Sequence, residues 1–113
     1  MSAAALVRCG GTEVFVKRHH KLVRTAAQLR AEHALADHLR ALGVAVPAVL
    51  RLPGGGSVAA SGDYVYEVHT LAPGVDVYRD VLSWEPFLSV RHARAAGAAL
   101  ARFHRASACT SYT

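Results

Sequence analysis

One lysine and one glutamate in this chain have the side-chain types and positions needed to hold an anion. Lys17 ends a short β-forming run, and Glu32 lies fifteen positions later among apolar residues that recur with a helical period. A carboxylate on the core-facing side of a helix is costly to bury unless a cation neutralises it. We therefore expect Lys17 and Glu32 to form a buried ion pair, and a lysine held in this way can bind phosphate groups.

The strand that carries Lys17 is expected to belong to a hairpin. Two β-forming runs, residues 4–8 and 12–18, flank Gly10 and Gly11. Glycine accepts the positive φ that tight turns need, so a Gly-Gly pair between two such runs predicts a hairpin turn.

The segment around Glu32 has the start and stop signals of a helix. Thr25 followed by Gln28 is the pattern of a capping box, and Gly43 is placed to end the helix. We expect the helix to span residues 26–42, with Glu32 on its inward face. The rest of that face would be formed by Gln28, Leu29, Leu35, Leu39 and Leu42, and the outer face by Arg30, His33, Asp37 and Arg40.

The remainder of the chain predicts further short strands and one more helix. Proline and glycine mark a turn at residues 53–56 and a hinge at residues 72–74. Ser89 is placed to cap a last helix, residues 90–106. The expected strands cover residues 48–52, 57–60 and 64–70. We therefore expect an α+β fold: a small, mostly antiparallel sheet with one packed helix, then a hinge and one helix of a second lobe.

The composition is that of a folded globular segment. With 113 residues, of which 52% are hydrophobic and 19% charged, the chain is too apolar to be disordered and too short for more than one domain. We expect one part to cover residues 1–72 and a second part to cover residues 73–113. The net charge of +5 is compatible with an anionic partner such as a nucleotide.

The cysteines and the hydrophobic runs exclude several classes of protein. Cys9 and Cys109 form no CxxC pair, so neither a cysteine zinc site nor a disulfide framework is predicted. No apolar run is long enough for a signal-peptide core or a membrane span. We expect reduced cysteines in a cytoplasmic protein that does not bind membranes.

The histidines do not have the local spacing of a metal site. His19 and His20 are adjacent, and His33 and His38 are five residues apart on the expected helix. Neither spacing suits a metal ion with tetrahedral coordination, whose ligands must converge on one point. The sequence therefore predicts no metal ligand in this chain.

Two other segments have a superficial similarity to binding motifs. The basic run at residues 17–21 has no interleaved aromatic residue, so we interpret it as a solvated connector and do not expect nucleic-acid binding. Residues 54–56 are three glycines, but no Lys-Ser/Thr pair and no helix follow them. A hairpin turn is expected there instead of a phosphate-binding loop.

Six short segments occur in an order and at a spacing that resemble a known family. They are Val14-Phe15-Val16-Lys17, Arg30-Ala31-Glu32-His33, Gly43-Val44-Ala45-Val46-Pro47, Tyr64-Val65-Tyr66-Glu67, Leu71-Ala72-Pro73-Gly74 and Ala99-Leu100-Ala101-Arg102-Phe103-His104. From Val14 to about Ser107 the sequence resembles the aminoglycoside phosphotransferase family, small-molecule kinases with a protein-kinase-like fold. The expected sheet and first helix would then be the nucleotide-binding lobe of such a fold.

The resemblance implies roles for several residues. Lys17 would hold the α- and β-phosphates of ATP, and Glu32 would orient Lys17. The adenine would be contacted by the main chain of the segment that leads to the hinge, at Glu67, Val68, His69 and Thr70. Members of the family use ATP with Mg²⁺ and transfer the γ-phosphoryl group to a small-molecule hydroxyl, so a nucleotide and an acceptor would be the partners.

The chain departs from the family pattern at both ends. The family has a His-Gly-Asp run followed by an Asn, and further on a magnesium-binding Asp, after the last helix expected here. The family also has a phosphate-covering loop ahead of the first strand expected here. We expect this chain to be a truncated nucleotide-binding lobe that has no catalytic residue and no magnesium ligand, and that is inactive alone.

Other functions stay open beside this interpretation. The main alternative is a non-catalytic module that binds a nucleotide or a partner chain, and a small basic nucleic-acid binder is a weaker one. Without a complete second lobe, part of the lobe interface would be apolar and exposed, which would favour self-association.

Overall fold

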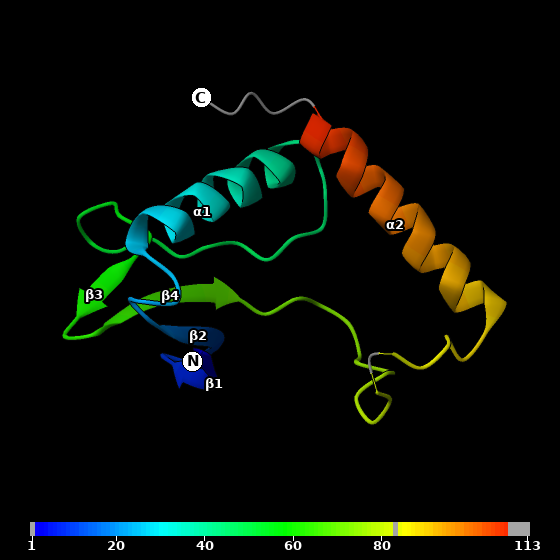
Figure 1. Ribbon diagram of the computed structural model, residues 1–113, viewed down its shortest axis with the longest axis horizontal. Coiled ribbons are helices and arrows are strands. Elements are labelled where there is room, and N and C mark those ends of the chain that lie inside the picture. Colours follow the sequence, from blue (N-terminus) through cyan, green and yellow to red (C-terminus); the bar gives the residue numbers. More distant parts are fainter. Residues whose placement is uncertain (1, 83, 109–113) are drawn as a thin grey trace. The chain divides into compact units, whose positions relative to one another are not determined.

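A computed structural model of the chain describes residues 2–82 and 84–108. Cys109, expected to be reduced, lies outside the described residues. The chain forms two compact units, one ending at Ala72 and the other beginning at Pro73. The first unit holds a four-stranded antiparallel sheet and one helix, and the second holds another helix (Figure 1). This architecture confirms the predicted α+β fold.

The sheet has two central strands, and they carry Lys17, His19, Glu67 and His69. The strands pair antiparallel in the order β1-β2-β4-β3, so β2 and β4 each have a neighbour on both sides. The four strands are β1 (Ser2–Cys9), β2 (Thr12–His20), β3 (Ala59–Ser61) and β4 (Tyr64–Thr70).

The predicted hairpin turn between β1 and β2 is confirmed. Gly10 and Gly11 have φ angles of 59° and 83°, the pair of positive values that a two-residue turn of this kind needs. The strands are longer than predicted, since Ser2 pairs with His19 in β1–β2 and His20 pairs with Tyr64 in β2–β4. Pairing on both sides of β2 extends the regular backbone beyond its most β-forming residues.

Helix α1 (Ala26–Ala41) begins at the predicted capping box. The amide of Gln28 donates to Thr25 Oγ1 over 3.2 Å, and the amide of Thr25 donates to Gln28 Oε1 over 2.9 Å. Gly43, with a φ of 83°, follows the C-terminal cap residue Leu42. The helix therefore stops one residue before the predicted end.

The inward face of α1 agrees with the prediction at Leu29 and Leu39 but differs from it elsewhere. Leu29, His33 and Leu39 are buried, whereas Gln28 and Glu32 are exposed. The buried stripe is displaced toward His33, because this side chain finds hydrogen-bonding partners beneath the helix. The apolar core of the described residues consists of Leu29, Leu39, Val49 and Val65.

The segment between α1 and β4 contains less strand than predicted. The expected strand at residues 48–52 is reduced to one bridge between Val49 and His69, and β3 starts at Ala59. The glycine-rich turn is confirmed, because the amide of Leu52 donates to the carbonyl of Gly56 over 2.7 Å. Regular pairing begins only after the turn has placed Ser57 in the interior of the unit.

The second unit is built around helix α2 (Val90–Ala108). Ser89 caps this helix as predicted: its Oγ accepts from the amide of His92 over 3.1 Å. The phenol of Tyr78 holds the preceding loop, accepting from the amide of Leu88 over 2.7 Å and bonding to His92 Nδ1 over 2.8 Å.

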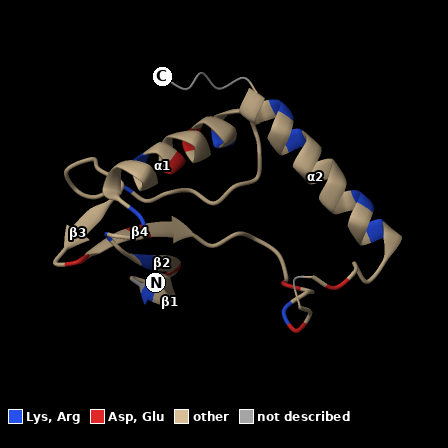
Figure 2. Cartoon of the chain, in the orientation of Figure 1, with Lys and Arg blue, Asp and Glu red and all other residues tan. Residues whose placement is uncertain are grey.

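Helix α2 is basic and exposed. Figure 2 shows lysine or arginine at intervals along it and no acidic residue; the cations are Arg91, Arg94, Arg102 and Arg105. No side chain of α2 is buried in the described part of the chain. None of the described helices is both long and apolar enough to cross a bilayer.

Candidate functional site

The two central strands bring chemically active side chains to one face of the sheet. In the β2–β4 register, Lys17 lies opposite Glu67 and Phe15 lies opposite His69. Side chains alternate between faces along a strand, so Lys17, His19, Glu67 and His69 share a face. Helix α1 covers this face, as the contacts of His33 with Glu67 demonstrate.

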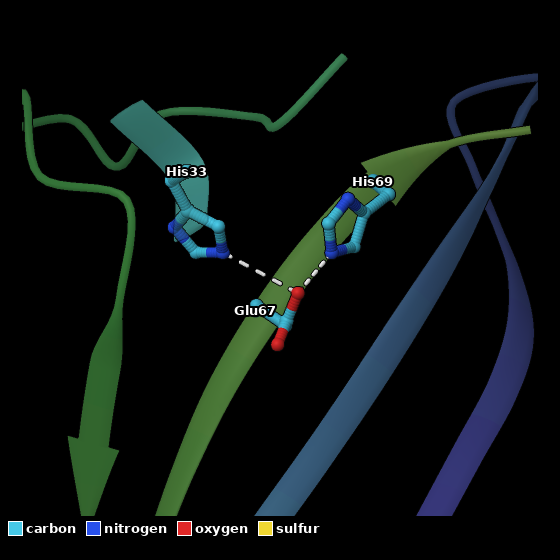
Figure 3. Close-up of side chains that lie close together, drawn as sticks. All are labelled: His33, Glu67 and His69. Atoms are coloured by element: carbon cyan, nitrogen blue, oxygen red, sulfur yellow. Dashed lines mark hydrogen bonds and ion pairs between the residues drawn. The ribbon is translucent and has the colours of Figure 1, made fainter. Parts of the chain in front are cut away.

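Glu67 is the centre of a histidine–glutamate cluster made of His19, His33, Glu67 and His69. His19 Nε2 donates to Glu67 Oε2 over 2.8 Å, and His33 Nε2 donates to Oε1 over 3.3 Å. His69 Nε2 also bonds to Oε1. Figure 3 shows the rings of His33, from α1, and His69, from β4, converging on the same carboxylate oxygen.

The cluster is buried, with one side that reaches solvent. The side chains of His33 and Glu67 are only 2% and 6% exposed, whereas that of His69 is 20% exposed. The outer nitrogen of His33 bonds to Ser57 Oγ over 2.7 Å, and that of His19 bonds to Ser2 Oγ over 2.8 Å. Both ring nitrogens of His19 and of His33 therefore have a hydrogen-bonding partner, which offsets the cost of burying these polar groups.

The environment keeps Glu67 ionised. Burial raises the pKa of this carboxyl, but the hydrogen bonds from His69, His19 and His33 outweigh the burial and lower the pKa to about 2. The cluster therefore holds a buried negative charge at neutral pH, surrounded by imidazole nitrogens.

The predicted buried ion pair between Lys17 and Glu32 is wrong. The Glu32 side chain is 55% exposed, and its carboxylate is paired with Arg24. Lys17 is exposed, and no carboxylate of the described residues lies within ion-pair distance of it. The reason is the rotation of α1: His33 occupies the inward position, and Glu32 lies at the edge, where it can stay hydrated.

The four residues expected at the adenine have structural contacts of their own. The carbonyl of Val68 accepts from Leu50 over 2.8 Å, and the amide of Thr70 donates to Ala48 over 2.9 Å. The side chains of Glu67 and His69 belong to the histidine–glutamate cluster. The carbonyl of Val68 and the amide of Thr70 are therefore already used by hydrogen bonds within the first unit.

Sequence reasoning missed the histidine–glutamate cluster. The local spacing of the histidines does not indicate the cluster, and the helical period predicts His33 on the outer face of the helix. One signal was present: Glu67 and His69 alternate with Tyr66 and Val68 in a β-forming run, which puts two polar side chains on one face. Their partners come from β2 and α1, and no local spacing indicates these.

Comparison with known proteins identifies the family. The sequence profile described as the phosphotransferase enzyme family matches residues 4–111, which include nearly the whole chain. A search of curated proteins gave no significant match. The profile match confirms the resemblance to aminoglycoside phosphotransferases that the six segments indicated. The chain belongs to the phosphotransferase enzyme family.

Proposed function

We propose that this chain supplies the ATP-binding part of a phosphotransferase that moves the γ-phosphoryl group of ATP to a small-molecule hydroxyl. The observation that carries the proposal is the family match over residues 4–111. Phosphoryl transfer depends mainly on positioning the nucleotide and on neutralising the charge of its phosphates. The proposal therefore requires a cation of this chain that can contact the phosphates.

Lys17 is that cation. It lies on β2, whose backbone is held by strands on both sides, so the position of its Cα is well defined. Its side chain is exposed, and within the described residues it has no carboxylate partner. An ammonium group that is not already neutralised is available to a phosphate. In this proposal Lys17 contacts the α- and β-phosphates of ATP.

Magnesium would accompany the nucleotide, as it does in phosphoryl transfer generally. The 113 residues contain no His-Gly-Asp run, which the family uses for the transfer step. We therefore propose that this polypeptide alone binds Mg-ATP without transferring phosphate. A cytoplasmic location, where ATP is abundant, agrees with this role.

Titration calorimetry with Mg-ATP tests the nucleotide site. We expect saturable binding that weakens about tenfold in Lys17→Ala, because one charge-assisted contact contributes about 1.4 kcal/mol. Lys21→Ala is the matched control, since Lys21 is also an exposed lysine but is paired with Asp63 at 3.2 Å. Absence of saturable binding, or equal losses in the two variants, would contradict the proposal.

Glu32→Gln tests whether the carboxylate of Glu32 pairs with Lys17 when nucleotide is bound. We expect the affinity for Mg-ATP to change less than twofold, because Glu32 is paired with Arg24 and is mostly exposed. A loss as large as that of Lys17→Ala would mean that Glu32 leaves Arg24 and reaches Lys17 in the complex. ATP turnover by the purified chain, abolished by Lys17→Ala, would overturn the proposed inactivity.

A further inference from the structure

We propose that His33, Glu67 and His69 form a binding site for a divalent transition-metal ion, with Zn²⁺ as the ion that fits best. The proposal goes beyond the phosphotransferase function and does not depend on nucleotide binding. It rests on the convergence of three ligand atoms from two elements of the first unit, α1 and β4.

The ligand atoms already lie close to the arrangement that a metal needs. One atom from each of the three side chains lies within 4.8 Å of the other two. The 3.3 Å between His33 Nε2 and Glu67 Oε1 equals the edge of about 3.3 Å that ligand bonds of about 2.0 Å give in a tetrahedral zinc site. The ring of His69 is nearer to Oε1 and is the least buried of the three, so a small rotation of this ring opens the site.

The chemistry of the three ligands selects the kind of ion. Two imidazole nitrogens and one carboxylate form a set that zinc uses when three protein ligands leave a fourth position for water. Mg²⁺ and Ca²⁺ prefer sites made of oxygen ligands, so two histidines disfavour them. The one-fifth exposure of the His69 side chain provides the access for the ion and for the water.

The residues around the three ligands are suited to hold them in place. Without metal, His33 Nε2 donates to Glu67 Oε1, and Nδ1 bonds to the hydroxyl of Ser57. With metal on Nε2, the same proton moves to Nδ1 and is donated to Ser57 Oγ, which accepts after its hydroxyl rotates. His19 Nε2 can keep its bond to Oε2, so Glu67 would bind the ion through Oε1 alone.

The alternative is a hydrogen-bonded cluster that never binds metal. In that case the histidines serve only as hydrogen-bond donors to a buried carboxylate, and added ions would bind weakly at scattered surface histidines. The two interpretations predict different stoichiometry and a different response to substitution of His69.

The test uses the full 113-residue chain, freed of metal with a chelator and then titrated with ZnCl₂ by calorimetry and with CoCl₂ by visible absorption. We expect one ion per chain and a Co²⁺ spectrum typical of four-coordinate sites. His69→Gln should weaken binding at least tenfold, whereas His104→Gln, an exposed histidine on α2, should change it less than twofold. Circular dichroism checks that each variant is folded.

The Zn²⁺ affinity of Ser57→Ala provides a second test. If the cluster were purely structural, this substitution would not change the Zn²⁺ affinity. It leaves all three ligands in place but removes the partner of His33 Nδ1, so we expect about tenfold weaker Zn²⁺ binding. Failure of the folded wild-type chain to bind one ion overturns the proposal, as does unchanged affinity in His69→Gln. If His69→Gln does not fold, the wild-type Co²⁺ spectrum decides, and a six-coordinate spectrum overturns the proposal.

Discussion

Glu67 and Glu32 are two carboxylates of the first unit, and they lie in opposite environments. Glu67 is buried on the sheet and accepts from three histidines, whereas Glu32 lies on the exposed edge of α1 and pairs with Arg24. Removing one partner of a buried charged group leaves the other without compensation, whereas an exposed ion pair contributes little. The contribution of a carboxylate to stability therefore follows from its burial and not from having a cation nearby.

The largest expected effect is the loss of Glu67. Glu67→Gln removes the charge that the three histidines surround, and we expect the free energy of unfolding to fall by about 3–5 kcal/mol. Urea unfolding monitored by circular dichroism measures the change. Glu32→Gln is the matched control and should cost at most about 1 kcal/mol. Equal losses in the two variants would remove the distinction between the two environments.

The second effect is a dependence of stability on pH that Glu67 produces. The pKa of Glu67 is lowered from 4.5 to about 2 on folding. Its contribution, about 3 kcal/mol, is therefore present above pH 4.5 and is lost as the pH falls from 4.5 toward 2. Unfolding curves between pH 6 and pH 2 check this, with Glu67→Gln as the variant in which this component is missing.

An intermediate effect is expected from the outer bonds of the cluster. Ser57→Ala leaves Nδ1 of a buried His33 without a partner and should lower the free energy of unfolding by about 1–2 kcal/mol. Thermal or urea unfolding measures it in metal-free protein. A loss below about 0.3 kcal/mol would indicate that water replaces the serine hydroxyl and that the cluster is less closed than its burial indicates.

The smallest effect is expected at the exposed pair. A double-mutant cycle with Arg24→Ala and Glu32→Ala should give a coupling free energy below about 1 kcal/mol that shrinks when salt is added. The same cycle with His19→Ala and Glu67→Ala should give a larger coupling that salt barely changes. A stronger, salt-insensitive coupling between Arg24 and Glu32 would contradict the distinction between the exposed Glu32 and the buried Glu67.

Features that depend on neighbouring residues were predictable from the sequence. The positive φ angles of Gly10 and Gly11, and the capping boxes or caps at Thr25 and Ser89, follow from the chemistry of a few consecutive residues. The order of the six segments likewise indicated the family that the profile match then established. The α+β architecture followed from these elements together.

The candidate site depended on contacts that no local pattern contains. Glu32 and His33 are adjacent, so choosing which of them faces the sheet is a rotation of α1 by one position. That choice is made by Ser57 and Glu67, which are 24 and 34 residues from His33 in sequence. The sequence by itself therefore determined the elements and the family, while the tertiary structure decided which carboxylate is buried, because only packing brings the histidines from β2, α1 and β4 around one side chain.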